Sequence, residues 1–410
     1  MKILVRVGSF LVVVGLMCGL QGHTTTAACP EIGGVVVDWL AHALWGVGSD
    51  TQLGILRDNG FSWVQVRVTT VSSATLRQHP PSEWHRLSWQ DEFWCSLEYA
   101  AESLRRAASL GMKLNLLLFL SAEAAWPCRQ NIPPEWRGLT DQELEKALEK
   151  YGAFVADYFV DQGLHIDLYT IGNEIELGIL NTVPGGDCVP SWVWHTAHPY
   201  YDVSYVDREV WPREASILKA VIRGIKSVDP EAKIALHADS LGRSPQALLT
   251  RSFFKAMIRY GVPFDFASIT YPDVSAKPFF EAPAKTASPY YRTYEFERTV
   301  SELNALGKRV IIGEFSYPHS PVGVSAEPDP GYPYTPEGQA KWVRDFLAAV
   351  AHLPGVFAVF YWAPDWFPGV SGGRWLFHES SGLFLTAVKP LPALEEFARF
   401  ITSCRLEGRN

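Results

Sequence analysis

The chain has 410 residues, of which 47% are hydrophobic, and it contains 15 Trp, 16 Tyr and 22 Phe. This composition is typical of a folded globular protein and excludes a disordered or fibrous chain. The formal net charge is −8 at pH 7, and no stretch concentrates Lys or Arg on one face. We therefore expect no nucleic acid or other anionic polymer as a partner.

The N-terminus has the pattern of a secretory signal peptide. Lys2 and Arg6 precede a short apolar run, and small residues end at Ala27-Ala28. We predict that residues 1–28 form the signal, that 29–410 form one catalytic domain, and that the protein is secreted or extracytoplasmic. The alternative is an uncleaved anchor, the one case in which we expect membrane contact. The apolar run is shorter than the roughly 20 residues that a membrane span needs.

Short apolar runs alternate with helical patterns along the chain. Leu144, Leu148 and Val155 repeat at helical spacing behind a capping box formed by Thr140 and Glu143. The apolar runs predict eight strands, at about 33–38, 62–68, 113–119, 166–172, 233–237, 264–270, 309–313 and 356–362.

The connections between these elements are of two kinds. Turns that enter strands are tight and marked by Gly or Pro, as at Asn59-Gly60 and Pro354-Gly355, whereas segments that leave strands are long, as at 175–207. This asymmetry favours an α/β fold, a single-domain (β/α)8 TIM barrel with elaborate loops at one end. A doubly wound open sheet is the alternative, but Asp38-Trp39-Leu40 stands where its Gly-rich phosphate turn would follow the first strand.

Two glutamates each end a β-branched apolar run. Glu174 ends the run that begins at Leu168, and Glu314 ends the run that begins at Val310. In a parallel barrel the carboxyl ends of the strands carry the chemistry, and strands four and seven face each other across its mouth. Two carboxyls at that place suggest a glycosidase pair, which in a retaining enzyme lie about 5 to 5.5 Å apart.

Further motifs occur in a fixed order through nearly the whole mature chain. They are 59–68 (NGFSWVQVRV), 111–114 (GMKL) with Phe119, 134–136 (PEW), 171–175 (IGNEI), 233–239 (KIALHAD), 264–265 (FD) with Tyr271-Pro272, 312–314 (IGE) and 359–366 (VFYWAPDW). This series resembles the arabinogalactan endo-β-1,4-galactanase family, family 53 in clan A of the retaining glycoside hydrolases. The resemblance implies a hydrolase that cleaves β-1,4-galactan or arabinogalactan by double displacement, without a cofactor, with Glu174 as acid/base and Glu314 as nucleophile.

Four residues are expected to support the two glutamates. Asn173 should bind the 2-hydroxyl of the sugar, and Arg67, inside an apolar run, needs a carboxylate partner, for which we choose Glu314. Tyr271 could donate a hydrogen bond to Glu314 or be an ordinary barrel-top aromatic. His237, at the end of strand five, is either a supporting residue or a satisfied core histidine.

The expected substrate contacts are mainly aromatic. Trp362, Trp366 and Trp375 follow strand eight, and flat rings suit the apolar faces of pyranosides, although core packing is the alternative for each. Asp38 and Glu123, in the loops after strands one and three, complete the expected substrate-binding residues. Glu176, two residues after Glu174, could bind substrate or be a solvated acid.

The chain departs from the family pattern in its cleft. Leu120-Ser121 stand where a His is usual, Glu123 where an Asp is common, and Asp273-Val274 where a Trp-His pair is expected. These changes fall on the expected sugar subsites and leave both glutamates in place, so they bear on which glycan is cleaved more than on the reaction. The alternatives are a retaining hydrolase of another plant β-glycan, of mannan or arabinan type, and a carbohydrate-binding barrel without turnover. The sequence does not decide which glycan is preferred, or whether the enzyme cleaves inside a chain or at its end. We expect a monomer whose partner is a polysaccharide or oligosaccharide substrate.

The last features concern metals and cysteines. No metal site is predicted, because the late-loop acids Asp329 and Asp365 lack a dense oxygen-ligand spacing. A structural calcium ion in a late loop is the alternative. The cysteines after the signal lack CxxC pairs, which favours disulfides in an exported chain, with one thiol left over. Barrel topology places Cys29 and Cys404 together at the bottom, and it makes a bridge between Cys128 and Cys188 at the top plausible.

Overall fold

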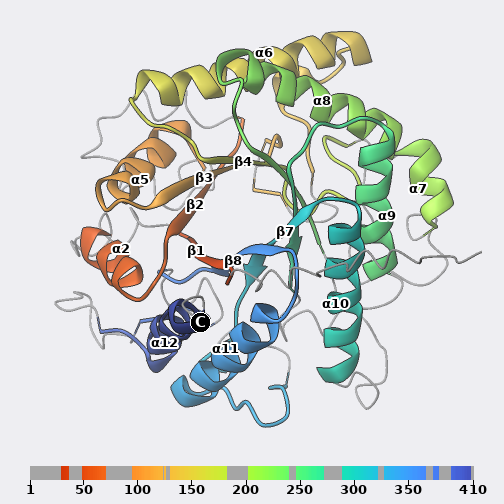
Figure 1. The fold of residues 1–410 in the computed structure, drawn as a ribbon. Helices are drawn as coiled ribbons and strands as arrows, with labels where there is room; N and C mark the ends of the chain where they lie inside the picture. The colour runs from red at the N-terminus through yellow and green to blue at the C-terminus, as the bar shows by residue number, and fades with distance from the viewer. Residues whose placement is uncertain are drawn as a thin grey trace, which may run out of the picture.

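The computed structural model describes residues 29–36, 49–70, 95–122, 124–125, 130–181, 202–239, 246–271, 289–321, 327–365, 373–377 and 389–407. Within these ranges the strands form a closed parallel barrel, and helices surround it (Figure 1). The sheet closes because the last strand pairs with the first, with Val35 opposite Trp362. The predicted (β/α)8 barrel is confirmed.

The elements alternate as the sequence predicts. The strands are β1 (Glu31–Val35), β2 (Trp63–Val68), β3 (Lys113–Leu118), β4 (Leu168–Ile171), β5 (Ile234–Ala238), β6 (Phe266–Thr270), β7 (Arg309–Phe315) and β8 (Val356–Trp362). The helices are α2 (Ser49–Asp58), α5 (Leu97–Ser109), the short η2 (Pro134–Trp136), α6 (Asp141–Asp161), α7 (Val203–Glu209), α8 (Trp211–Val228), α9 (Gln246–Arg259), α10 (Pro289–Ala305), α11 (Pro336–Ala351) and α12 (Pro392–Glu407).

Side chains fill the interior of the barrel. An apolar cluster in the barrel consists of Val35, Trp63, Leu168, Ala235, Ile311, Ala358 and Phe360, all buried. Three buried polar side chains in the barrel form a chain of hydrogen bonds: Asn115 donates to Gln65 at 2.8 Å, and the Thr170 hydroxyl donates to Asn115 at 2.9 Å. Because a buried polar group without a partner is costly, this chain of hydrogen bonds lets polar residues occupy the barrel.

The long helix α6 starts and packs as its sequence indicates. The Thr140 side chain accepts from the Glu143 backbone, while the Glu143 side chain accepts from the Thr140 backbone, so the predicted capping box is confirmed. The helix lies beside α8 (Figure 1). A Cβ on Gly152 would lie 2.3 Å from the Val221 carbonyl oxygen, so only glycine permits this close approach.

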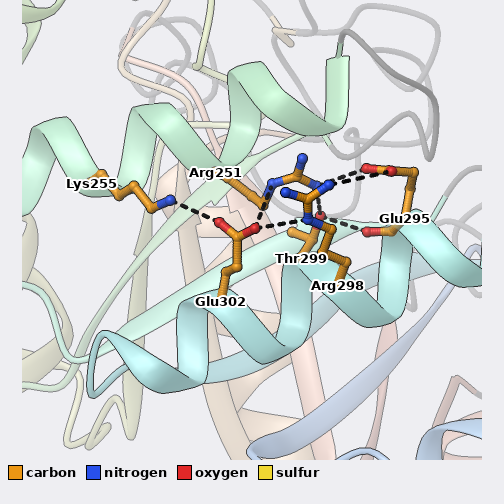
Figure 2. A network of polar contacts seen from close by, with 6 residues as sticks. All are labelled: Arg251, Lys255, Glu295, Arg298, Thr299 and Glu302. Atoms are coloured by element: carbon orange, nitrogen blue, oxygen red, sulfur yellow. Dashed lines mark hydrogen bonds and ion pairs between the residues drawn. The ribbon is translucent and has the colours of Figure 1, made fainter.

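An ionic network with Arg251 and Glu295 at its buried centre joins α9 to α10 (Figure 2). Arg251, whose side chain is 4% exposed, lies 3.0 Å from Glu295 and 3.6 Å from Glu302. Lys255 and Arg298 complete the network at 2.8 and 2.9 Å from Glu302. Buried ion pairs add little net stability but require one geometry, because breaking them leaves a buried charge. The network therefore fixes α10, which leads directly into β7 and Glu314.

In the described ranges, no helix combines the length and the apolar composition that crossing a membrane requires. The predicted signal peptide, residues 1–28, lies outside the described residues.

One disulfide closes the bottom of the barrel. Cys29, just before β1, is bonded to Cys404 in α12, with their Cα atoms 5.8 Å apart. The predicted bridge is confirmed. Cys95 is buried and keeps its thiol, whereas the predicted Cys128–Cys188 bridge lies outside the described residues.

We expect Cys404→Ser to lower the free energy of unfolding, by up to about 5 kcal/mol, because the bridge restricts a loop of nearly the whole chain in the unfolded state. Urea denaturation of the variant and the wild type measures the difference. In reductant the two proteins should unfold at the same urea concentration. A difference that persists in reductant would contradict a role for the bridge.

Candidate active site

The carboxyl ends of the parallel strands meet at one mouth of the barrel. Among the described residues, six polar or aromatic side chains lie toward this end, at or near the last residues of β2, β4, β5, β6, β7 and β8: Arg67, Glu174, His237, Thr270, Glu314 and Trp362. Because the barrel is closed and every pair is parallel, residues far apart in the chain share this mouth.

Glu174 lies in a strained turn directly after β4. Its φ is 53°, in the left-handed region that costs a non-glycine residue about 1 to 2 kcal/mol. The backbone N–H of Ile175 donates to the His237 carbonyl at 3.2 Å, which ties the turn to β5. The Thr270 hydroxyl donates a hydrogen bond of 2.8 Å to Oε1 of Glu174. Backbone strain and a fixed carboxyl together are typical of a functional residue.

Glu314 faces Arg67 across the mouth. Nη1 of Arg67 lies 3.9 Å from Oε1 of Glu314, and the two side chains are 17% and 14% exposed. The guanidinium also lies 5.7 Å from the ring centre of Phe119. The predicted pairing of Arg67 with Glu314 is confirmed, and the low exposure makes this attraction stronger than that of a surface pair.

Thr270 connects the two glutamates. It pairs in register with Glu314 across β6 and β7, next to an irregularity in the pairing, and its hydroxyl binds Glu174. Sequence reasoning missed this residue and chose its neighbour, Tyr271. The signal was the alternation of the strand: residues 266, 268 and 270 share one face, so Thr270 rather than Tyr271 points into the barrel.

The Tyr271 ring lies on the helical side of β6. It packs edge-on against Phe296 of α10 at 4.8 Å and against Phe346 of α11 at 4.9 Å, and it lines a cavity of about 140 Å³ between these helices. Its backbone N–H donates to the Glu314 carbonyl at 2.7 Å. These contacts fit the barrel-top aromatic alternative, and a hydrogen bond from the Tyr271 phenol to Glu314 stays a prediction.

His237 is fully buried below the mouth. Its Nε2 lies 3.1 Å from the Thr270 hydroxyl oxygen. Burial, assisted by the positive charge of Arg67, lowers the pKa of His237 to about 3. The imidazole is therefore neutral at any pH at which the fold is expected to work.

Asn173 holds two loops together. Its Nδ2 donates to the Ala125 carbonyl at 2.9 Å, and its own carbonyl accepts from Gln130 at 2.9 Å. Its Oδ1 is buried and has no hydrogen-bond partner among the described residues. A buried polar atom without a partner carries an unfavourable cost, so this oxygen is an acceptor that the contacts of the described residues leave unused.

The aromatic residues after β8 differ in exposure. Trp362 is half-buried at the strand end, and the guanidinium of Arg374 lies 6.0 Å from its ring centre. Trp375 is only 2% exposed, with its ring edge-on to His319 at 4.9 Å, which fits the packing alternative. Three predicted substrate-binding residues lie outside the described residues: Asp38, Glu123 and Trp366.

Two further acids are buried behind Glu174. Glu176 is 4% exposed, and its Oε2 accepts from the Asp239 backbone at 2.8 Å, which excludes the solvated-acid alternative. Burial, reinforced by the negative charge of Glu174, raises the pKa of Glu176 to about 8. Glu214 of α8 is fully buried, and burial raises its pKa well above the usual range. Burial therefore favours the protonated form of both carboxyls.

In the part of the chain that the structure describes, no group of three or more His, Cys, Asp or Glu side chains is arranged to hold a metal ion. Asp329, considered above for calcium, has its Oδ2 3.3 Å from Nε1 of Trp342, which donates to it.

The chain is similar in sequence and in fold to several known proteins. A probable arabinogalactan endo-beta-1,4-galactanase A of Neosartorya fischeri is 26% identical over 282 residues, covering 66% of this chain and 69% of that protein. An arabinogalactan endo-beta-1,4-galactanase of Humicola insolens is 24% identical over 324 residues, covering 76% and 80%. A solved structure of fungal beta-1,4-galactanases shares the fold, with a TM-score of 0.67 at 19% identity, over 91% of this chain and all of that one.

The model of the family described as Glycosyl hydrolase family 53 matches residues 46–397, which include Arg67, Glu174, Thr270, Glu314 and Trp362. The chain therefore belongs to glycosyl hydrolase family 53 and is a glycoside hydrolase.

Proposed function

We propose that this protein is a secreted retaining hydrolase that cleaves β-1,4-galactan or arabinogalactan by double displacement. The observation that carries the proposal is the pair of glutamates, Glu174 and Glu314, at one mouth of the barrel. Thr270 lies between them: its hydroxyl binds Glu174, and its backbone is opposite Glu314 in the pairing of β6 and β7. The galactanase names of relatives from two fungi support the choice of substrate.

In the first step the Glu314 carboxylate attacks the anomeric carbon, while Glu174 gives a proton to the leaving oxygen. A covalent glycosyl-enzyme forms. In the second step Glu174 takes a proton from water, which displaces the sugar from Glu314. Arg67 balances the charge of Glu314 and fixes its position.

The substrate is held by groups around the pair. The buried Oδ1 of Asn173 accepts a hydrogen bond from the 2-hydroxyl of the reacting sugar, and the exposed part of the Trp362 ring contacts a pyranose face. His237 is a supporting residue, whereas Trp366, Asp38 and Glu123 stay candidates for the outer subsites.

Export of a monomeric enzyme is part of the proposal. It is supported by the Cys29–Cys404 disulfide, since such bonds persist in oxidising compartments, and by the signal-like sequence of residues 1–28. Release of reducing ends from galactan, arabinogalactan, mannan and xylan tests the substrate. Faster cleavage of mannan or xylan than of galactan would overturn the choice of galactan.

We expect Glu314→Ala to lower kcat by a factor of about 10⁴ or more, because the attacking group is removed. Azide should restore cleavage of an activated aryl glycoside and give an inverted glycosyl azide, since a small anion fits the space left by the carboxylate. Product NMR identifies the anomer. Glu231→Ala, which removes an exposed carboxylate elsewhere, is the control and should not respond to azide.

Glu174→Ala should show a loss that depends on the leaving group. Substrates with a poor leaving group need the proton, and their cleavage should slow by a factor of about 10² to 10⁴. A dinitrophenolate leaves without protonation, so the first step of dinitrophenyl glycoside cleavage should keep nearly its wild-type rate. Values of kcat/KM for a series of aryl glycosides measure this dependence. Equal losses across the series would contradict the acid role.

Arg67→Met should lower kcat by about 10- to 100-fold, because Glu314 loses its charge partner and its fixed position. Arg67→Lys, which keeps the charge, should recover part of the loss. Thermal unfolding separates this effect from a loss of stability. Wild-type kinetics in Arg67→Met would show that the pair is structural.

A further inference from the structure

The contact between Thr270 and Glu174 fixes one oxygen of the acid/base. Thr270 has a single hydroxyl proton, which it donates to Oε1 of Glu174 at 2.8 Å. An oxygen that accepts this bond is the carbonyl-like oxygen of the protonated carboxyl. The proton of Glu174 is therefore carried by Oε2, the other oxygen.

His237 determines the direction in which the Thr270 hydroxyl points. Two proton arrangements are available for the 3.1 Å contact between Nε2 and Oγ1. If Nε2 carried no proton, Nδ1 would be a buried N–H donor, and Nδ1 has no hydrogen-bond partner among the described residues. Buried donors without partners are rarer than buried acceptors without partners. The favoured tautomer has the proton on Nε2, which donates to Thr270, so the Thr270 proton points toward Glu174.

The neutral state of His237 keeps this direction fixed. Its pKa of about 3, which follows from burial and from the nearby Arg67, prevents protonation in the working range of pH. Packing holds the ring in place: a Cβ on Gly313 would lie 3.2 Å from Nε2 of His237 and 2.3 Å from the Ser268 hydroxyl oxygen. Only glycine before Glu314 leaves room for these two side chains.

We propose that Thr270, supported by His237, is a positioning residue for the acid/base: it holds Oε1 of Glu174 so that Oε2 delivers the proton to the leaving oxygen. This inference rests on the proposed function. It names a role for Thr270 that acts through Glu174 and requires no contact with substrate.

Two substitutions separate the hydroxyl from the shape of the side chain. Thr270→Val keeps the shape and removes the hydrogen bond, whereas Thr270→Ser keeps the hydroxyl. We expect Thr270→Val to lower kcat/KM by about tenfold on substrates with poor leaving groups and to leave dinitrophenyl glycosides within about twofold, because only the first class needs the proton. Thr270→Ser should restore the rate. If Thr270→Val does not fold, Thr270→Ala takes its place.

The pH profile gives a readout that a structural role would not move. A hydrogen bond donated to a carboxylate favours its ionised form, so its loss should move the alkaline limb of kcat/KM to higher pH in Thr270→Val. The titration of Glu174 by carbon NMR, with the signal assigned by its absence in Glu174→Gln, should show the same upward shift. Ser103→Ala removes a buried hydroxyl on helix α5, outside the barrel, and should shift neither.

The outcomes are distinguishable. If the wild type cleaves galactan and Thr270→Val matches it in kinetics and in the Glu174 titration, the role of Thr270 is overturned and the proposed function stands. Equal losses on both substrate classes, or an equal shift in Ser103→Ala, also overturn it. A wild type without turnover on any glycan overturns the proposed function, and the role of Thr270 with it.

Discussion

Parallel pairing of every strand, closed by β8 onto β1, is the constraint on which the site depends. It sends the carboxyl ends of all strands to one rim, so Arg67, Glu174, Thr270 and Glu314 meet although they are distant in the chain. The constraint also sets the fine geometry. Thr270 reaches Glu174 because its strand register places it opposite Glu314, and a shift by one residue would turn its side chain to the helical face.

The rim contains backbone strain that the rest of the barrel supports. Leu120, Glu174 and Ala363 have φ values of 62°, 53° and 61°, and they follow β3, β4 and β8. Such conformations persist only where surrounding contacts impose them. Below the rim, the buried hydrogen bonds among Gln65, Asn115 and Thr170 and the packed apolar cluster supply that support, and the disulfide holds the two ends of the chain at the opposite side.

The two catalytic candidates have different electrostatic surroundings, which a pair with separate roles requires. Glu314 has a cation, Arg67, within 3.9 Å, and this charge favours a carboxylate at that position. Glu174 has the neutral Thr270 hydroxyl at Oε1, the neutral His237 behind it and the buried acid Glu176 nearby. The proposed nucleophile and the proposed acid are therefore distinguished by the side chains that surround them.

Much of the fold could be predicted because the signals are local. The strand runs, the Thr140 capping box and the Gly-marked turns are set by neighbouring residues, and the order of short and long connections then indicates a barrel. The same reasoning placed Glu174, Glu314 and Arg67 at strand ends, and topology alone brought Cys29 to Cys404. These features depend on the chain direction and on strand order, which the sequence carries by itself.

Other features depend on which side chain faces which, and the tertiary structure alone decided these. Thr270 and Tyr271 are neighbours in sequence and alternate between the two faces of β6. The tertiary structure decides what each side chain meets: Thr270 binds Glu174 inside the barrel, whereas Tyr271 packs against α10 and α11. Glu176 resembles a solvated acid in sequence, but the close packing of α8 and the turn after β5 bury it and favour its protonated form. Burial and hydrogen-bond direction arise from contacts between distant segments, so no local pattern contains them.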